Sequence, residues 1–181
     1  MFRHLAQLSV FLTCLSACSG PTLTTPAAVP AASPAPTAVP DRATQELDIL
    51  ESVYRYQFEH NFSGRSSASF DYVFLSRGSS SSVNNDPPAE LLARFAGNTP
   101  PVEPVSASEI GKDGGTGVTL KYLGGRGIIF RLDQVRWIDG ETVDVDGGYY
   151  VSSRGSSGNT YRAKLQGGRW VVVKDERHWV S

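Results

Sequence analysis

The sequence predicts an α+β fold in which an amphipathic N-terminal helix and a short second helix pack on a curved antiparallel sheet. Two observations lead to this prediction. Apolar residues recur at helical spacing between Thr44 and Phe58. After Gly117 the chain alternates apolar and polar residues between turn signals, a pattern typical of an antiparallel meander. Helices followed by a run of strands indicate an α+β domain.

The first expected element is a helix over 44–58. Its apolar residues follow an i, i+3, i+7 pattern, which gives one face for burial: Leu47, Leu50, Val53, Tyr54 and Phe58. His60 comes at the end of this helix, where an imidazolium suits the negative end of the helix dipole. Residues 69–76 alternate about Phe70, Tyr72 and Phe74, and this alternation predicts a strand.

A short helix is expected over 90–97. Asp86 is predicted to cap it, Pro87 to occupy its first position, and Gly97 to provide a left-handed exit. The segment 98–117 is rich in proline and glycine, so we expect it to be irregular.

The clearest hairpin ends the chain, with a turn at Gly167 and Gly168. A two-residue turn there sets apolar residues opposite one another: Leu165 faces Trp170, and Ala163 faces Val172. The register is therefore supported by its own cross-strand pairs.

The preceding hairpin turns near Asp139 and Gly140. A two-residue turn would oppose Val135 to Asp144, whereas one extra residue in the connection gives better pairs. Those pairs are Trp137 with Val143, Val135 with Val145, and Arg136 with Asp144. We therefore expect the odd count, with a bulge beside the turn.

The N-terminal residues are typical of an export signal. A positive start, Met1–His4, precedes a mostly apolar run from Leu5 to Leu15, which is too short to span a bilayer. Leu15-Ser16-Ala17-Cys18 resembles the lipobox of bacterial lipoproteins. That resemblance implies cleavage before Cys18, a diacylglyceryl group on its sulfur and acylation of the new amino group. It places the protein in the bacterial cell envelope, at the outer membrane facing the periplasm in a Gram-negative host. An ordinary secretory signal or a Cys14–Cys18 disulfide are the alternatives.

Three segments follow from this interpretation: a signal peptide over 1–17, a lipidated N-terminus with a Pro/Ala-rich linker over 18–42, and one globular domain over 43–181. The linker has the composition of a polyproline II stalk or of an unstructured leader. Loss of Arg3 with the signal leaves 16 basic and 18 acidic residues, a mature charge of −2. This balance argues against a nucleic-acid partner.

Helix first, then strand, short helix and meander, is an order that resembles the nuclear transport factor two-like fold, in which a curved sheet wraps a helix. The resemblance extends over 44–181 and rests on element order. A cystatin-like arrangement or an open sheet on a helix are the competing folds.

Few residues indicate chemistry. His60 and His178 lack metal-ligand spacing, so we expect no metal, and no cofactor-binding loop occurs at the required spacing. Trp137, Tyr149 and Trp170 either fill the core or line a pocket for an apolar ligand or a glycan. In the odd-count register Asp133 faces Gly147 on the face of Val135 and Trp137, which would make it an inward base unless the strand bends there. The strand changes phase nearby, since Ile128, Phe130 and Leu132 have the other parity.

The function that these observations favour is a membrane-tethered, non-catalytic domain that binds an envelope protein or a small ligand. The alternatives are a small pocket enzyme, of the lyase, isomerase or hydrolase type, that uses Asp133, and a structural role in the envelope.

Overall fold

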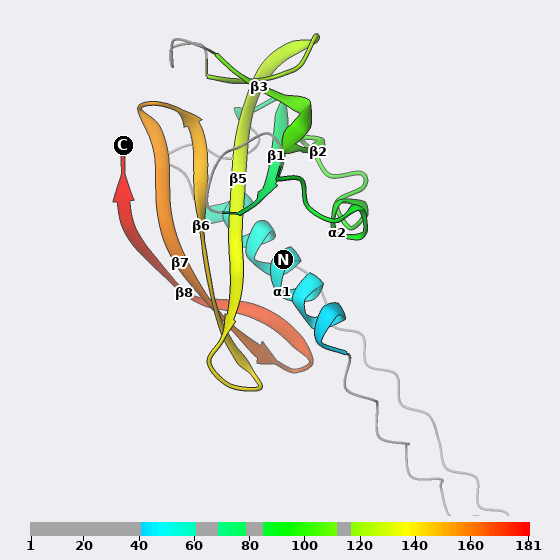
Figure 1. Cartoon of the computed structure of the whole chain (residues 1–181), viewed down its shortest axis with the longest axis vertical. Coiled ribbons are helices and arrows are strands. Elements are labelled where there is room, and N and C mark those ends of the chain that lie inside the picture. The colour runs from blue at the N-terminus through cyan, green and yellow to red at the C-terminus, as the bar shows by residue number, and fades with distance from the viewer. Residues whose placement is uncertain (1–40, 61–68, 79–84, 112–116) are drawn as a thin grey trace, which may run out of the picture. The chain divides into compact units, whose positions relative to one another are not determined.

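The computed structural model describes residues 41–60, 69–78, 85–111 and 117–181. All of them lie in one compact unit, Val39–Ser181. It is a mixed α+β structure with one long helix, a small second helix and an open, curved sheet (Figure 1). Its elements are α1 (Arg42–His60), β1 (Tyr72–Arg77), α2 (Ala89–Ala93), β2 (Val102–Pro104), the 3-10 turn η2 (Val105–Ala107), β3 (Ser108–Ile110), β4 (Val118–Leu120), β5 (Gly124–Trp137), β6 (Thr142–Ser152), β7 (Gly155–Gln166) and β8 (Arg169–Val180).

Helix α1 contains the whole of the segment predicted to be helical. Asp41 precedes it and caps it, since the Thr44 amide donates to Asp41 Oδ1 over 3.0 Å. One face of the helix is buried against the sheet: Ile49, Leu50, Val53, Tyr54, Gln57 and Phe58. Arg94, just after α2, donates to Asp48 and Glu51 of α1 over 2.6 and 3.0 Å, which ties the two helices together.

The sheet has the strand order β2-β1-β5-β6-β7-β8, with β3 and β4 attached beside β5. The predicted meander is confirmed, because each strand from β4 to β7 pairs antiparallel with the next strand along the chain. The prediction of a wholly antiparallel sheet is wrong. β1 runs parallel to β5, with Tyr72 opposite Gly127, and also parallel to β2. Between β1 and β5 the chain forms α2 and the short strands β2, β3 and β4, which belong to the same sheet.

Both predicted hairpin registers are confirmed. Leu165 lies opposite Trp170 and Ala163 opposite Val172 in the last hairpin. In the hairpin of β5 and β6, the odd count holds, and the pairs are Trp137 with Val143, Val135 with Val145, and Arg136 with Asp144. Apolar cross-strand pairs on a buried face fix these registers.

The short elements differ from their predictions. Pro88, rather than Asp86, immediately precedes α2, and Asp86 instead accepts a hydrogen bond from the Ser106 amide over 2.8 Å. Gly97 does adopt the predicted left-handed conformation, with φ of +78°. The segment expected to be irregular contains β2, η2 and β3. Strands of three residues are too short to leave an alternating pattern.

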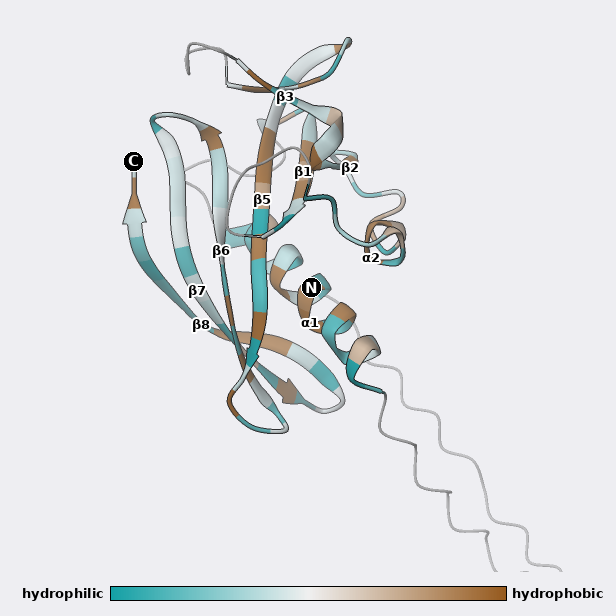
Figure 2. Ribbon diagram, in the orientation of Figure 1, coloured by the Kyte–Doolittle hydropathy of each residue, from teal (hydrophilic) through white to brown (hydrophobic). Residues whose placement is uncertain are grey.

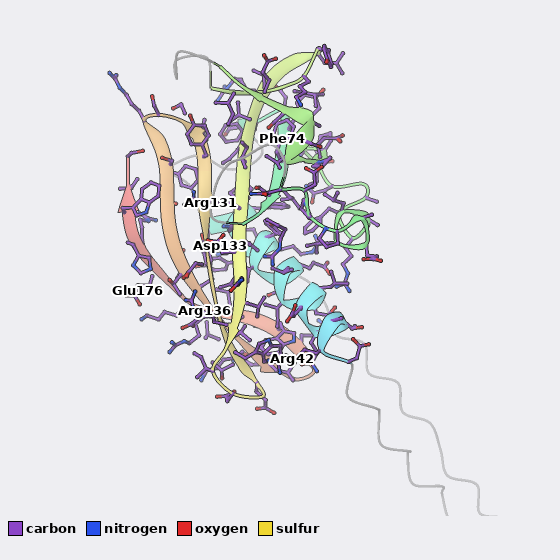
Figure 3. The ribbon with its side chains drawn as sticks, in the orientation of Figure 1. Arg42, Phe74, Arg131, Asp133, Arg136 and Glu176 are labelled. Carbon is purple, nitrogen blue, oxygen red and sulfur yellow. The ribbon has the colours of Figure 1, made fainter. Side chains whose placement is uncertain are left out.

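Apolar residues are buried on both faces of the sheet. The main core lies between α1 and the sheet and includes Val73, Leu75, Ile128 and Phe130. Neighbouring strand residues point to opposite faces. Phe74 and Ile129 therefore lie on the other face, where they form a second cluster with Val105 and Val118. The second cluster covers only the part of that face near β3 and β4, and the rest of the face carries charged side chains (Figure 3).

Candidate functional site

A β-bulge in the middle of β5 produces the most distinctive group of polar residues. Leu132 pairs with Gly147, and the next aligned pair is Val135 with Val145. Asp133 and the residue after it therefore share one position opposite β6. The bulge keeps β5 in phase with the core, because Leu132 and Val135 both pack there despite their odd separation. In Figure 2, hydrophilic stretches interrupt the hydrophobic colouring of β5 in this region.

The expected inward position of Asp133 is wrong. Leu132, not Asp133, lies opposite Gly147. Since Leu132 points into the core, Asp133 points to the opposite, charged face of the sheet. The change of parity in the sequence had indicated this bend. Arg131, Asp133 and Arg136 follow one another along β5 in Figure 3.

A cleft of about 400 Å³ opens at the bulge. Its lining comes from β5, β6 and the end of β1, and consists of Arg77, Gly78, Asp133, Gln134, Arg136 and Asp146. The sequence analysis singled out only Asp133 as a functional candidate. Arg77 and Gly78 reach the cleft through the parallel pairing of β1 with β5, which no local pattern encodes.

Arg77 holds the bulge in place. Its Nη1 donates to the carbonyl oxygen of Leu132 over 3.1 Å and to the carbonyl oxygen of Asp133. The amide of Gly78 donates to the same Leu132 oxygen over 2.9 Å. The charge of Arg77 thus lies beside the cleft, while its Nη1 group donates to the backbone.

Arg136 and Asp146 form a bidentate ion pair across the cleft. Arg136 Nη2 donates to Asp146 Oδ1 over 3.0 Å, and Nη1 donates to Oδ2. The hydroxyl of Thr160 adds a hydrogen bond of 2.6 Å to Oδ1. The hydrogen bond from Arg136 is the main reason that the pKa of Asp146 is lowered. Asp144, although it lies opposite Arg136, pairs instead with Arg162 over 2.8 Å.

Asp133 has a different environment. Its Oδ1 is buried and makes no hydrogen bond within the described residues. Desolvation raises the pKa of the Asp133 carboxyl, and the nearby charge of Arg131 opposes that effect without cancelling it. A carboxyl of this kind can bind a hydrogen-bond donor or carry a proton. Neither a histidine nor a hydroxyl nucleophile is hydrogen-bonded to it in the described chain, so the cleft holds one acid–base group without a partner.

The three aromatic residues proposed for a pocket do not come together. Trp137 and Trp170 pack edge to face, with ring centroids 5.4 Å apart, and both contribute to the main core. Tyr149 is buried in the same core but is paired with Phe130, away from both. Tyr149 is six residues along β6 from Val143, the partner of Trp137, which corresponds to roughly 20 Å. Trp170 also borders a second cleft of about 530 Å³ beside α1.

The remaining candidates have structural surroundings or lie elsewhere. Cys18, the predicted lipidation site, lies outside the described residues. His60 stacks on Tyr56 with ring centroids 4.3 Å apart, and its Nδ1 lies 3.1 Å from the Tyr56 carbonyl oxygen. His178 Nε2 lies 2.8 Å from the hydroxyl of Thr160. Within the described ranges, no cluster of three or more His, Cys, Asp or Glu could hold a metal ion. Nor does any described helix have the length and hydrophobicity needed to cross a bilayer.

No family model, curated protein or solved structure matched the chain.

Proposed function

We propose that this chain is a lipid-anchored protein of the bacterial envelope whose domain binds a protein partner through the edge strand β8 of its sheet. The anchor is proposed from the lipobox-like residues that end at Cys18. Two or three acyl chains give stable membrane attachment, whereas one chain is marginal. In a Gram-negative host the domain would face the periplasm from the outer membrane.

The exposed edge strand β8 carries the proposal. β8 stands at the end of the strand order and is 12 residues long. Four of its apolar residues are 42–56% exposed: Val171, Val173, Trp179 and Val180. A long edge with apolar side chains favours pairing with an extended segment of another chain, whose backbone continues the ladder. The core on the α1 side is packed with aromatic residues, which favours a surface interaction over a buried ligand.

Features of the same edge restrict what can pair with it. Register shifts in the pairing with β7 make Val173 and His178 extra residues on β8. Bulges and a lysine such as Lys174 are devices that prevent indiscriminate edge pairing. A partner strand must therefore match a ladder that two bulges interrupt, which gives the interaction specificity.

A pull-down from intact envelopes tests this function. We expect Val171→Lys to reduce capture of the partner at least severalfold relative to the wild type, because a charged side chain on the edge opposes strand addition. Ile138→Lys is the matched control, since Ile138 is also exposed but lies in the turn between β5 and β6. Equal capture by both variants would contradict docking at the edge. Cys18→Ala should lose membrane association, which tests the anchor separately.

A second candidate function is a small pocket enzyme of the lyase, isomerase or hydrolase type. The observation that favours it is the partnerless carboxyl oxygen of Asp133 in the charged cleft. A helix against a curved sheet is also compatible with nuclear transport factor two-like architecture, which we retain as a proposal. If Asp133→Asn changed neither turnover nor small-ligand binding, this candidate would be dropped.

A further inference from the structure

The turn between β4 and β5 presents two apolar side chains directly to solvent. Tyr122 is 100% exposed and Leu123 is 78% exposed. They are the most exposed of the large hydrophobic side chains in the described structure. We name this pair the 122–123 tip. Figure 1 places the turn between β4 and β5 at the end of the domain opposite to the start of α1.

The backbone of the 122–123 tip is strained in a way that packing does not explain. Tyr122 has φ of +64°, in the left-handed region that bulky residues rarely adopt. Gly124 and Gly125 follow with φ of +73° and +81°, so the turn already uses glycine where it needs this conformation. A tyrosine kept at a strained position without burying its ring indicates that the ring is used outside the molecule.

Two basic residues flank the tip, and the carboxylate of Asp71 accepts a hydrogen bond of 2.7 Å from the Arg126 amide beside it. Lys121 precedes it and donates from Nζ to the Ser106 carbonyl oxygen over 2.5 Å. Arg126 follows it, with its guanidinium 5.5 Å from the ring centre of Phe70. A protruding aromatic and aliphatic pair between basic residues matches the chemistry of a membrane–water interface, where tyrosine rings and basic side chains meet lipid head groups.

We propose that the 122–123 tip inserts into the interfacial layer of the lipid bilayer. This inference rests on the proposed function, because it uses the acyl anchor to bring the bilayer near. A lipid surface fits better than a protein pocket, since specific protein interfaces bury about 800 Å² on each partner. Two side chains on a convex turn offer far less, whereas a bilayer accepts isolated side chains of this kind.

The anchor makes such a weak contact effective. Two inserted side chains do not hold a free protein on a membrane, but a tether raises the effective concentration of the tip to about the millimolar range. The 23 residues from Cys18 to Pro40 could reach roughly 70 Å at about 3.1 Å per residue. The 14 residues of β5 span roughly 46 Å. The linker is therefore long enough for the far end of the domain to return to the same bilayer.

A single fluorophore can test the insertion, because the mature chain has no cysteine besides Cys18. Leu123→Cys in the full acylated protein would carry an environment-sensitive dye, in vesicles of phosphatidylcholine and phosphatidylglycerol with lipid-borne quenchers. Ile138→Cys is the control, at a turn near the other end of β5. We expect several-fold stronger quenching at 123 than at 138. Equal quenching at the two positions, whether weak or strong, would overturn the proposal.

A second arm separates failure of the tip from failure of the anchor. The double variant Cys14→Ser/Cys18→Ala, carrying the same dye at 123, would be held through a C-terminal histidine tag on nickel-chelating lipid, and position 123 would stay the only labelled cysteine. Strong quenching here, with no membrane association of the untagged wild type, would support the tip and refute the acyl anchor. Weak quenching here would refute the tip whatever the state of the anchor. Tyr122→Asn, which tolerates positive φ, should reduce the quenching severalfold without unfolding the domain.

Discussion

The indole of Trp137 meets that of Trp170 edge to face, with ring centroids 5.4 Å apart and ring planes inclined at 86°. The contact joins the end of β5 to the start of β8, and the guanidinium of Arg42 lies 3.6 Å over the ring of Trp137. One cluster therefore connects both long hairpins with the first turn of α1.

Loss of this contact should cost much of the stability of the domain. We expect Trp170→Ala to lower the free energy of unfolding by about 3–5 kcal/mol, since it leaves a large cavity in the core. Trp179→Ala is the matched control. Its ring is half-exposed and meets the guanidinium of Arg131 at 5.8 Å, so about 1 kcal/mol is expected. Urea denaturation of the two variants measures the difference. If both variants lost the same free energy of unfolding, the contact between Trp137 and Trp170 would not be a major source of stability.

Gly148 allows β6 and β7 to approach closely. A Cβ atom at this position would lie 1.9 Å from the carbonyl oxygen of Ser157. Because a backbone atom is in the way, Gly148→Ala should destabilise the domain by about 1–3 kcal/mol or more. Gly140→Ala should be nearly neutral, because no atom lies within 4 Å of its added Cβ. Thermal unfolding of both variants compares them, and a stable Gly148→Ala protein would refute the close approach.

Asp133 should make stability depend on pH with the opposite sign to Asp146. Burial raises the pKa of the Asp133 carboxyl above its ordinary value of 3.8. The contribution of Asp133 to the free energy of unfolding is therefore favourable below pH 3.8 and is lost as the pH rises through the pKa of the folded state. Asp133→Asn should therefore be more stable than the wild type at neutral pH and lose this advantage in acid. The pKa of Asp146 is lowered, chiefly by Arg136, so Asp146→Asn should be less stable at neutral pH. Urea midpoints across the pH range measure both trends, and trends of the same sign would contradict the assignment.

The strain at Tyr122 predicts a stabilising substitution. Tyr122→Gly should raise the free energy of unfolding by about 1 kcal/mol, because glycine adopts positive φ without steric cost and the exposed ring loses no packing. Leu123→Gly is the control and should be neutral or destabilising. A destabilised Tyr122→Gly protein would show that the ring does contribute to the fold. A Tyr122→Gly protein that is more stable but binds the membrane more weakly would support a role of the tyrosine ring in membrane binding.

The sequence predicted the hairpins of the sheet better than its overall order. The partners of Leu165 and Val135 could be found by matching apolar residues across a nearby turn, which is a local property. The parallel pairing of β1 and β5 could not, because the alternation about Phe74 shows that a strand forms but not which strand it joins. Asp86 was a reasonable cap by composition, yet its carboxylate is used by Ser106, twenty residues away.

The candidate site could be predicted from the sequence only in part, for the same reason. The parity change before Val135 left a bend as the alternative to an inward Asp133, and the structure has that bend as a bulge in β5. Arg77, however, reaches the bulge from a parallel strand. Arg136 forms its ion pair with Asp146 and not with Asp144, the residue directly opposite it on β6. Diagonal and long-range polar contacts of this kind depend on the assembled sheet.

The parallel pairing of β1 with β5 also sets the order in which the domain can fold. Tyr72 pairs with Gly127, which lies 55 residues further along the chain. The pairing therefore closes a long loop, and contacts between residues so far apart in sequence form slowly. A chain that ends before β5 offers β1 only the three residues of β2. The polypeptide should therefore stay unfolded until its last third has been made, and the export that we propose would require a chain that is still unfolded.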